Sequence, residues 1–184
     1  NVICAKYMGA RNVKELRQTV HTSLILCIWA GFLILIAGQA FSFGILKILH
    51  TKKELIEGAQ LYLRIYFLGM PAPAIYNFGN GILSASGDTK TPLKYLFAAG
   101  VINVILNLFF VIGFGMDVDG VAIASVISQY ISAALILRKL FTTKEDFSIA
   151  LSELSVKKDK ALALIAIGIP AGIQNAIFNI ANLF

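Results

Sequence analysis

Five long stretches of this chain contain no Asp, Glu, Lys or Arg, and the short segments between them hold nearly all the charge. These stretches are residues 18–46, 65–87, 95–116, 120–137 and 161–184. A helix needs about 20 mostly apolar residues to cross a bilayer, and each stretch reaches that length, the fourth only just. The pattern predicts an all-α, polytopic integral membrane protein. We expect spans over about residues 18–46, 58–87, 92–115 and 119–138, and a further helix over 161–184.

Composition excludes a water-soluble domain, because 58% of the residues are hydrophobic and only 14% are charged. The chain opens on Asn rather than Met and stops inside an apolar run, so we expect it to be a piece of a longer polypeptide. The first apolar run is far longer than the apolar region of a signal peptide.

Basic residues are distributed unequally between the two ends of the predicted helices. If the chain crosses at each span, one side carries twelve Lys and Arg residues, in segments 1–17, 88–94 and 138–160, and the other carries three, at 47–53. The positive-inside rule therefore predicts that the Asn1 side and the 138–160 segment are cytoplasmic, in a multi-pass protein of the plasma (inner) membrane. The net charge of +6 reflects this orientation rather than a nucleic-acid surface.

Prolines interrupt two of the apolar stretches. Pro71 and Pro73 lie well inside the second, and Pro170 lies in the fifth, within a Gly-Ile-Pro-Ala-Gly run. Each proline removes a backbone hydrogen bond, so we expect the helices to kink or unwind at these residues. Gly/Pro-interrupted helices of opposite direction are typical of inverted-repeat transporters, although ordinary packing kinks would give the same pattern.

Two polar segments have their own local signals. In the turn 87–92 we expect Thr91 to be the N-cap and Pro92 the first residue of the next helix. In the segment 141–160, Phe147, Ala150, Leu151 and Leu154 have helical spacing, which predicts a short amphipathic helix on the membrane surface.

Amide side chains inside the apolar stretches are the candidate chemistry. Asn103 and Asn107 are four residues apart and therefore share one helical face, and Ser125, Ser128, Gln129 and Ser132 form a similar polar stripe. Such faces turn toward neighbouring helices or toward water, where they form either a polar binding site or interhelical hydrogen bonds that only hold the bundle together. Further amides in the second and fifth stretches are Asn77, Asn80, Gln174, Asn175, Asn179 and Asn182.

Groups needed for most other chemistry are missing from the sequence. No carboxylate lies within a predicted span, so part of any proton-coupling chemistry must come from outside these residues, whereas amide and hydroxyl oxygens can help to ligate sodium. There is no P-loop, no nucleophile motif and no metal-ligand spacing, so we expect neither an enzyme nor a cofactor. His21 and His50 stand alone and are expected to be interfacial.

Several of these motifs together resemble those of the multidrug and toxic compound extrusion (MATE) family. They are the run 79–92 (GNGILSASGDTKTP), the run 103–107 (NVILN), the run 120–125 (GVAIAS) with Ser128-Gln129, and Gly168-Ile169-Pro170. The resemblance covers essentially the whole chain, which would be the end of the second membrane helix through the start of the seventh. It implies a two-lobe transporter in which residues 1–140 belong to the amino lobe, 141–160 are the cytoplasmic linker between lobes, and 161–184 begin the second lobe.

The resemblance also implies a site. The family's polar site in the amino lobe would fall on Asn80, Asn103, Asn107 and Ser125, and sodium could bind at the same residues. Two departures matter: the family's acidic residue in the first helix would precede Asn1, and the fifth stretch lacks the Glu that one branch carries. Asn107 is also neutral where some relatives have Asp, which leaves sodium and proton coupling both open.

Our hypothesis from the sequence is a secondary antiporter that exports organic cations or drugs across the inner membrane in exchange for sodium ions or protons. Its partners would be the lipid bilayer, small organic and often cationic substrates, and the rest of the same polypeptide. Two alternatives remain: a related lipid-linked oligosaccharide flippase, which should place Lys or Arg in its cavity, and a membrane scaffold or assembly subunit without transport.

Overall fold

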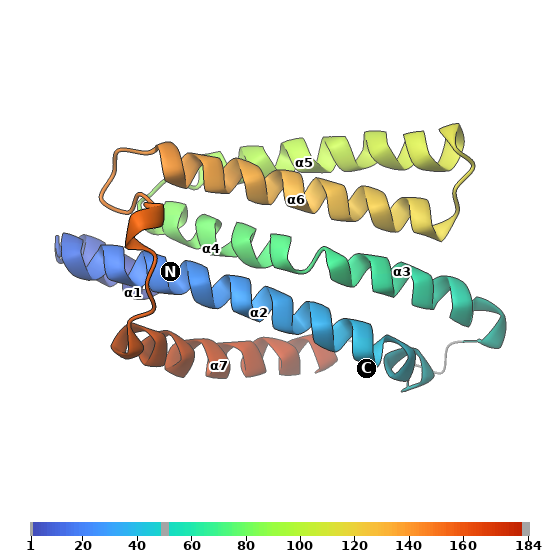
Figure 1. Ribbon diagram of the computed structural model, residues 1–184, viewed down its shortest axis with the longest axis horizontal. Coiled ribbons are helices and arrows are strands. Elements are labelled where there is room, and N and C mark those ends of the chain that lie inside the picture. Colours follow the sequence, from blue (N-terminus) through green and yellow to red (C-terminus); the bar gives the residue numbers. More distant parts are fainter. Residues whose placement is uncertain (1, 49–51, 182–184) are drawn as a thin grey trace.

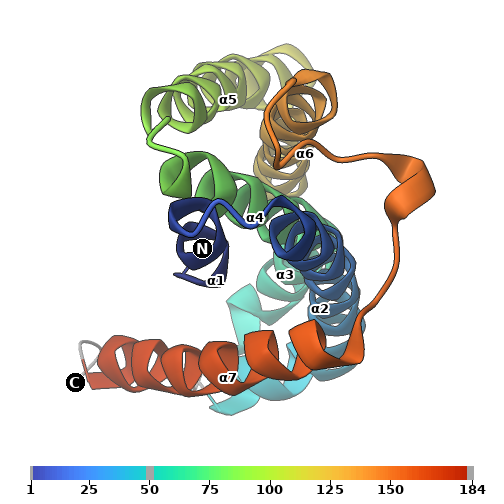
Figure 2. The same ribbon diagram turned by 90° about the vertical axis from the view of Figure 1, so that its left-hand side faces the viewer.

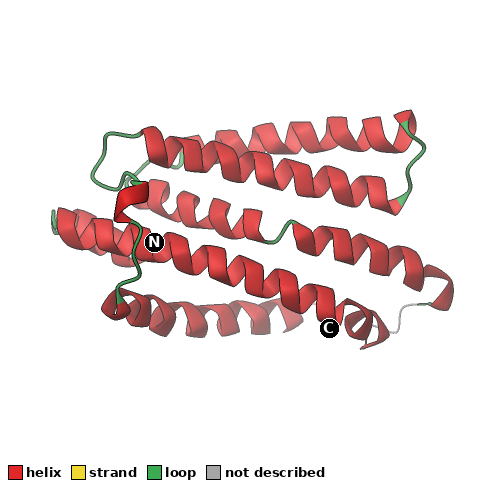
Figure 3. Cartoon of the chain, in the orientation of Figure 1, coloured by secondary structure: helices red, strands yellow, loops and turns green. Residues whose placement is uncertain are grey.

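The computed structural model describes residues 2–48 and 52–181, and this part of the chain contains helices and loops but no strand (Figures 1 and 3). The predicted all-α fold is confirmed. His50 and Asn182 lie outside the described residues. The main helices are α1 (Val2–Gly9), α2 (Val13–Ile48), α3 (Ile56–Leu68), α4 (Pro71–Ala85), α5 (Lys90–Leu108), α6 (Val118–Thr142) and α7 (Lys158–Ala181). Two 3₁₀ turns, Lys53–Leu55 and Leu151–Glu153, and a π-helix, Phe109–Gly113, complete the described elements.

Four helices are long and apolar enough to cross a membrane: Val13–Ile48, Lys90–Gly113, Val118–Thr142 and Lys158–Asn179. Large apolar side chains remain exposed on them, such as Trp29 on α2 and Phe97 on α5. At 1.5 Å per residue, the 36 residues of α2 extend about 54 Å, well beyond a hydrocarbon core of about 30 Å. The N-terminal turns of α2 therefore reach past the apolar layer.

The second predicted span is a broken helix. α3 ends at Leu68 and α4 begins at Pro71, and the two follow one another end to end along the bundle (Figure 1). The Tyr130 hydroxyl of α6 donates to the Leu68 carbonyl at 2.9 Å, which supplies a partner where the helical pattern is interrupted. Pro73 lies in the first turn of α4, where its missing N–H costs no interior hydrogen bond, so the two prolines share one interruption, directly before Pro71.

The break lies against glycines of α2. A Cβ added to Gly31 would lie 2.7 Å from the Cα of Pro71, and one added to Gly38 would collide with the Phe67 ring. Only the absence of a side chain at these positions lets α2 approach the break this closely. α2 and α6 thus enclose it from two sides.

The start of α5 differs from the prediction. α5 begins at Lys90, and the Asp88 carboxylate accepts the Thr91 N–H at 3.0 Å, so Asp88 rather than Thr91 provides the capping side chain. Hydrogen bonds from the Thr91 hydroxyl and N–H hold the pKa of Asp88 below its ordinary value, with nearby Lys139 and Lys94 acting in the same direction.

The predicted amphipathic helix in the segment 141–160 is also wrong. Between the end of α6 and the start of α7 this segment is mostly irregular, with a turn near Phe147 and a 3₁₀ turn at Leu151–Glu153, and it passes around α2 (Figure 2). Phe147 and Ile149 point into the core formed by α1, α2, α4 and α6, and Leu151 is exposed. Phe147 lies in a turn and Ile149 follows it in irregular backbone, so these two side chains enter the core without a helix between them.

The ends of the bundle agree with the predicted topology. The α1–α2 and α4–α5 turns and the α6–α7 segment lie at one end, and the α5–α6 turn lies at the other (Figure 1). α7 packs beside α2, but almost all of its side chains are exposed, including Gln174, Asn175 and Asn179. Pro170 lies inside this continuous helix.

Candidate functional site

A hydrogen-bonded cluster of amides and hydroxyls joins α5 to α6. The Asn103 Nδ2 donates to the Ser128 Oγ at 3.2 Å and to the Ser125 Oγ at 3.4 Å. The Asn107 Nδ2 in turn donates to the Asn103 backbone oxygen and to the Asn103 Oδ1, both at 3.0 Å. The structure thus brings together three of the four predicted site residues, Asn103, Asn107 and Ser125, and adds Ser128.

Local sequence explains this geometry. Each serine uses its hydroxyl hydrogen within its own helix, Ser125 toward the Val121 carbonyl at 3.0 Å and Ser128 toward the Ser125 carbonyl at 2.9 Å. Both hydroxyl oxygens therefore offer lone pairs toward α5, and Asn103 is the donor that reaches them. Asn107 lies one helical turn after Asn103 and therefore shares its face of α5.

One atom of the cluster lacks a partner. The Asn107 Oδ1 is buried and accepts no hydrogen bond from any residue that the structure describes. Leaving a buried acceptor without a donor costs about 1–3 kcal/mol. A carbonyl oxygen in this position can accept a proton donor or help to coordinate a hard cation such as sodium.

A cavity of about 470 Å³ lies beside the cluster, between α3, α5 and α6. Tyr62 and Tyr66 of α3, whose rings stack at 5.9 Å, face the polar stripe of α6 across it, and Ala99 and Gly100 keep the α5 side open. Aromatic faces favour organic cations. The lining residues are Tyr62, Tyr66, Leu96, Ala99, Gly100, Asn103, Ser125, Ser128, Gln129 and Ser132, and none of these is charged.

Sequence reasoning missed the two tyrosines. The available signal was their spacing of four residues, which places both on one face of the helix that precedes Gly69 and Pro71. The sequence did indicate Gln129 as part of the polar stripe. Its buried Oε1 is also without a donor among the described residues, and it packs against Gly69 at the break between α3 and α4. The cavity therefore adjoins the broken helix.

Asn80 stands apart from the cluster. Its Oδ1 accepts a hydrogen bond from the Ser84 hydroxyl one turn along α4, at 3.2 Å, and Asn80 does not line the cavity. The fourth predicted site residue is thus not brought to the other three.

The end of α5 contains a feature that the sequence did not predict. Directly after Asn107 and Leu108, the helix widens into the π-helix Phe109–Gly113, and the Met116 N–H donates to the Phe110 carbonyl at 3.1 Å. Phe109, Phe110 and Phe114 pack together there, with the Phe109 and Phe114 ring centroids 5.0 Å apart. π-helical turns occur frequently at functional sites.

Comparison with known proteins identifies the family. The family model described as MatE matches residues 1–109, and this matched part contains the broken helix and both asparagines of the cluster. The chain belongs to the MatE family. Its relatives include the probable multidrug resistance protein YpnP of Bacillus subtilis, which is 34% identical over 154 residues, covering 78% of this chain and 34% of YpnP.

Solved MATE structures share the fold. A crystal structure of MATE in the bent conformation has a TM-score of 0.91 and 25% identity, covering 99% of this chain and 41% of that one. An inward-facing conformation of a multidrug resistance MATE family transporter of the MOP superfamily has a TM-score of 0.83, also at 25% identity, covering 92% of this chain and 39% of that one.

Membership confirms several predictions. The chain is a multi-pass membrane protein of a transporter family, not of an enzyme family. It spans 34–41% of the length of these relatives.

Proposed function

We propose that this MatE chain is part of a secondary antiporter that exports organic cations or drugs across the plasma membrane in exchange for sodium ions or protons. The observation that carries the proposal is the buried, unpartnered Asn107 Oδ1 in an uncharged polar cluster beside an aromatic-lined cavity, within helices that can span a membrane. Residues 2–48 and 52–140 supply this cluster as the amino lobe. Residues 141–160 form the cytoplasmic linker, and α7 begins the second lobe.

The cluster and the adjoining tyrosines offer binding groups for two different kinds of cation. Asn107, Asn103 and the two serine hydroxyls offer oxygen ligands to a hard cation, while Tyr62 and Tyr66 offer aromatic faces to an organic cation. Because six to eight ligands are usual for a hard cation such as calcium, and few are gathered here, further ligands would come from residues outside this chain or from water. Competition between the two cations for adjoining positions would couple their movements.

Alternating access would follow from rocking of two lobes about this site. The family provides the precedent, because solved relatives include an inward-facing and an outward-facing conformation. The coupling ion in this proposal is either sodium or a proton. No carboxylate lies in the described part of the cluster, so proton coupling would need a residue outside it.

The test is dye efflux from membrane vesicles that contain the full-length protein, under imposed sodium or proton gradients. We expect Asn103→Ala and Asn107→Ala each to reduce efflux at least tenfold, because each removes oxygen ligands and the hydrogen bonds that orient them. Asn77→Ala is the matched control, since Asn77 is an exposed amide on α4. Full efflux with both Asn103 and Asn107 replaced would contradict the site.

The two alternatives make different predictions, one for the cavity lining and one for the efflux assay. A flippase for lipid-linked oligosaccharides should present Lys or Arg to its cavity, and none is found among the lining residues described here. A scaffold would use the cluster only as helix packing, in which case efflux would respond to neither gradient. In that case the loss of Asn103 would affect stability alone.

A further inference from the structure

The segment that joins the two lobes is held tightly against α2. We call residues 147–160 the strap; it runs from the buried Phe147 to the first turn of α7, around the N-terminal half of α2 (Figure 2). Side chains 151–159 of the strap are exposed, so burial fixes only its two ends. Between these ends, polar contacts with α2 hold the strap in place.

His21 holds the first part of the strap. The imidazole is 1% exposed, with its Nδ1 2.7 Å from the Arg17 carbonyl and its Nε2 3.1 Å from the Ala150 nitrogen. Because the backbone N–H of Ala150 must donate, Nε2 is the acceptor and Nδ1 carries the hydrogen that goes to Arg17. Both ring nitrogens are therefore used, one within α2 and one toward the strap.

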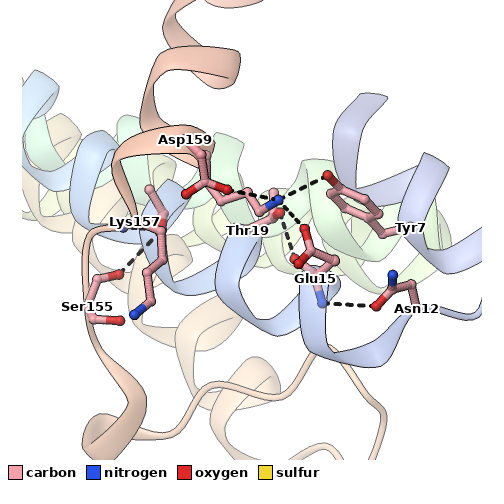
Figure 4. Close-up of polar contacts among 9 residues, drawn as sticks. Tyr7, Asn12, Glu15, Thr19, Ser155, Lys157 and Asp159 are labelled. Atoms are coloured by element: carbon pink, nitrogen blue, oxygen red, sulfur yellow. Dashed lines mark hydrogen bonds and ion pairs between the residues drawn. The ribbon is translucent and has the colours of Figure 1, made fainter.

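Thr22 holds the second part. Its hydroxyl donates to the Ser155 carbonyl at 3.3 Å and accepts the Lys157 N–H at 3.2 Å, and the side chain is fully buried. One hydroxyl thus satisfies two backbone groups of an extended segment that has no sheet or helix of its own. Figure 4 shows Ser155 and Lys157 at this point of the strap.

Lys160 holds the end of the strap, in the first turn of α7. Its ammonium group is paired with the Glu15 carboxylate, lies 3.2 Å from Asp159 Oδ2, and donates to the Tyr7 hydroxyl at 3.1 Å (Figure 4). It also lies 5.0 Å from the centroid of the Tyr7 ring. α1, α2 and α7 therefore meet at one buried ammonium group.

The remainder of α7 contains a proline between two glycines. Pro170 lies between Gly168 and Gly172, inside the helix. Proline leaves the Ala166 carbonyl without its usual helical donor, and the flanking glycines allow backbone rotation. A bend in α7 therefore costs least at these residues.

We propose that His21 and Thr22 are positioning residues that make the strap and the first turn of α7 part of the amino lobe. The lobes then move relative to one another by bending of α7 at residues 168–172, not by flexing of the linker. This inference rests on the proposed function only for the two-lobe movement. The attachment of the strap is independent of what is transported.

The attachment is tested by hydrogen exchange of the full-length protein in detergent. In Thr22→Val the hydroxyl is lost but the shape is kept, so we expect the Lys157 amide to exchange roughly five- to tenfold faster, the factor expected for one hydrogen bond. Thr22→Ser should restore protection. Equal exchange in Thr22→Val and the unaltered protein would overturn the role of Thr22.

Dye efflux kinetics provide a second test with the same two variants. We expect Thr22→Val to lower the maximal efflux rate severalfold without changing the KM for dye, because the cavity is untouched, and we expect Thr22→Ser to restore the rate. An increase in KM with an unchanged maximal rate would contradict a positioning role.

The bending point is tested by spin-label distances in a background with Cys4→Ser and Cys27→Ser. The pair Lys94→Cys and Ser152→Cys joins α5 to the strap, and the pair Ser152→Cys and Ala176→Cys spans the proline of α7; all three labelled positions are exposed. With dye or sodium added, we expect the first distance to stay constant and the second to change. A change in the first distance would overturn the proposal.

The outcomes separate the two proposals. If the unaltered protein exports no dye under either gradient, the proposed function fails, while the exchange results still decide whether the strap is attached. If efflux is normal but Lys157 exchanges freely or the first distance changes, the strap proposal fails and the proposed function stands.

Discussion

Gly31 offers the sharpest test of how the broken helix is packed. A Cβ at this position would lie 2.7 Å from the Cα of Pro71 and 3.3 Å from the Ala74 Cβ. The first of these neighbours is backbone, so rotation of a side chain cannot relieve the collision. Gly31→Ala therefore requires α2 to move away from the start of α4.

The expected change in the free energy of unfolding is the sum of two opposing effects. Replacing Gly by Ala inside a helix gains about 1 kcal/mol of helix propensity, whereas overpacking a close contact costs about 1–3 kcal/mol. Gly44→Ala is the matched control in the same helix, because a Cβ there meets nothing within 4 Å. Propensity cancels between the two variants, so Gly31→Ala should be less stable than Gly44→Ala by about 1–3 kcal/mol.

The assay is thermal unfolding of the purified protein in detergent, with recovery of monodisperse protein after heating as a second measure. We expect Gly44→Ala to unfold at or above the temperature of the unaltered protein, and Gly31→Ala several degrees below it. Equal transition temperatures for the two variants would refute the close approach of α2 to the break.

Two further predictions concern single hydrogen bonds at helix ends. Tyr130→Phe should destabilise the protein by about 1 kcal/mol in the same unfolding assay, because it removes the donor to the Leu68 carbonyl at the break; no change would mean that this carbonyl finds another partner. Asp88→Ala should cost about 1 kcal/mol at neutral pH by removing the capping carboxylate. The pKa of Asp88 is lowered in the folded state, so its contribution is present above the unfolded pKa of about 4 and is lost as the pH falls through the lowered pKa. The difference between Asp88→Ala and the unaltered protein should therefore vanish in strong acid, and a difference that persists there would contradict this account.

Most of the candidate site was predictable because its geometry is local. Asn103 and Asn107 share a face by helical periodicity alone, and the serine stripe of α6 is likewise a repeat of three and four residues. That these two faces meet was expected from the cost of leaving amides toward lipid. Asn80 is likewise an amide inside an apolar stretch, but its Oδ1 accepts a hydrogen bond from Ser84 within α4. Periodicity alone cannot distinguish such a contact within one helix from a contact between helices.

The strap shows where local patterns mislead. Phe147, Ala150, Leu151 and Leu154 have helical spacing, yet the segment forms no α-helix between α6 and α7, and the core between α2, α4 and α6 accepts Phe147 and Ile149 instead. His21 and Thr22 then provide the hydrogen-bond partners that a helix would have supplied from within. Propensity over a few residues is outweighed by burial of two large apolar side chains.

The sequence by itself determined that this chain crosses a membrane, roughly where its apolar spans lie, and which residue types gather on two of their faces. These features depend on composition and on short-range periodicity, which each segment carries within itself. Only the tertiary structure decided that the Leu68 carbonyl is satisfied from α6, that Tyr62 and Tyr66 face the amides across a cavity, and that the strap is bound to α2. Those contacts join residues far apart in the chain, and they exist because every buried polar backbone group must find a partner wherever the packed helices place one.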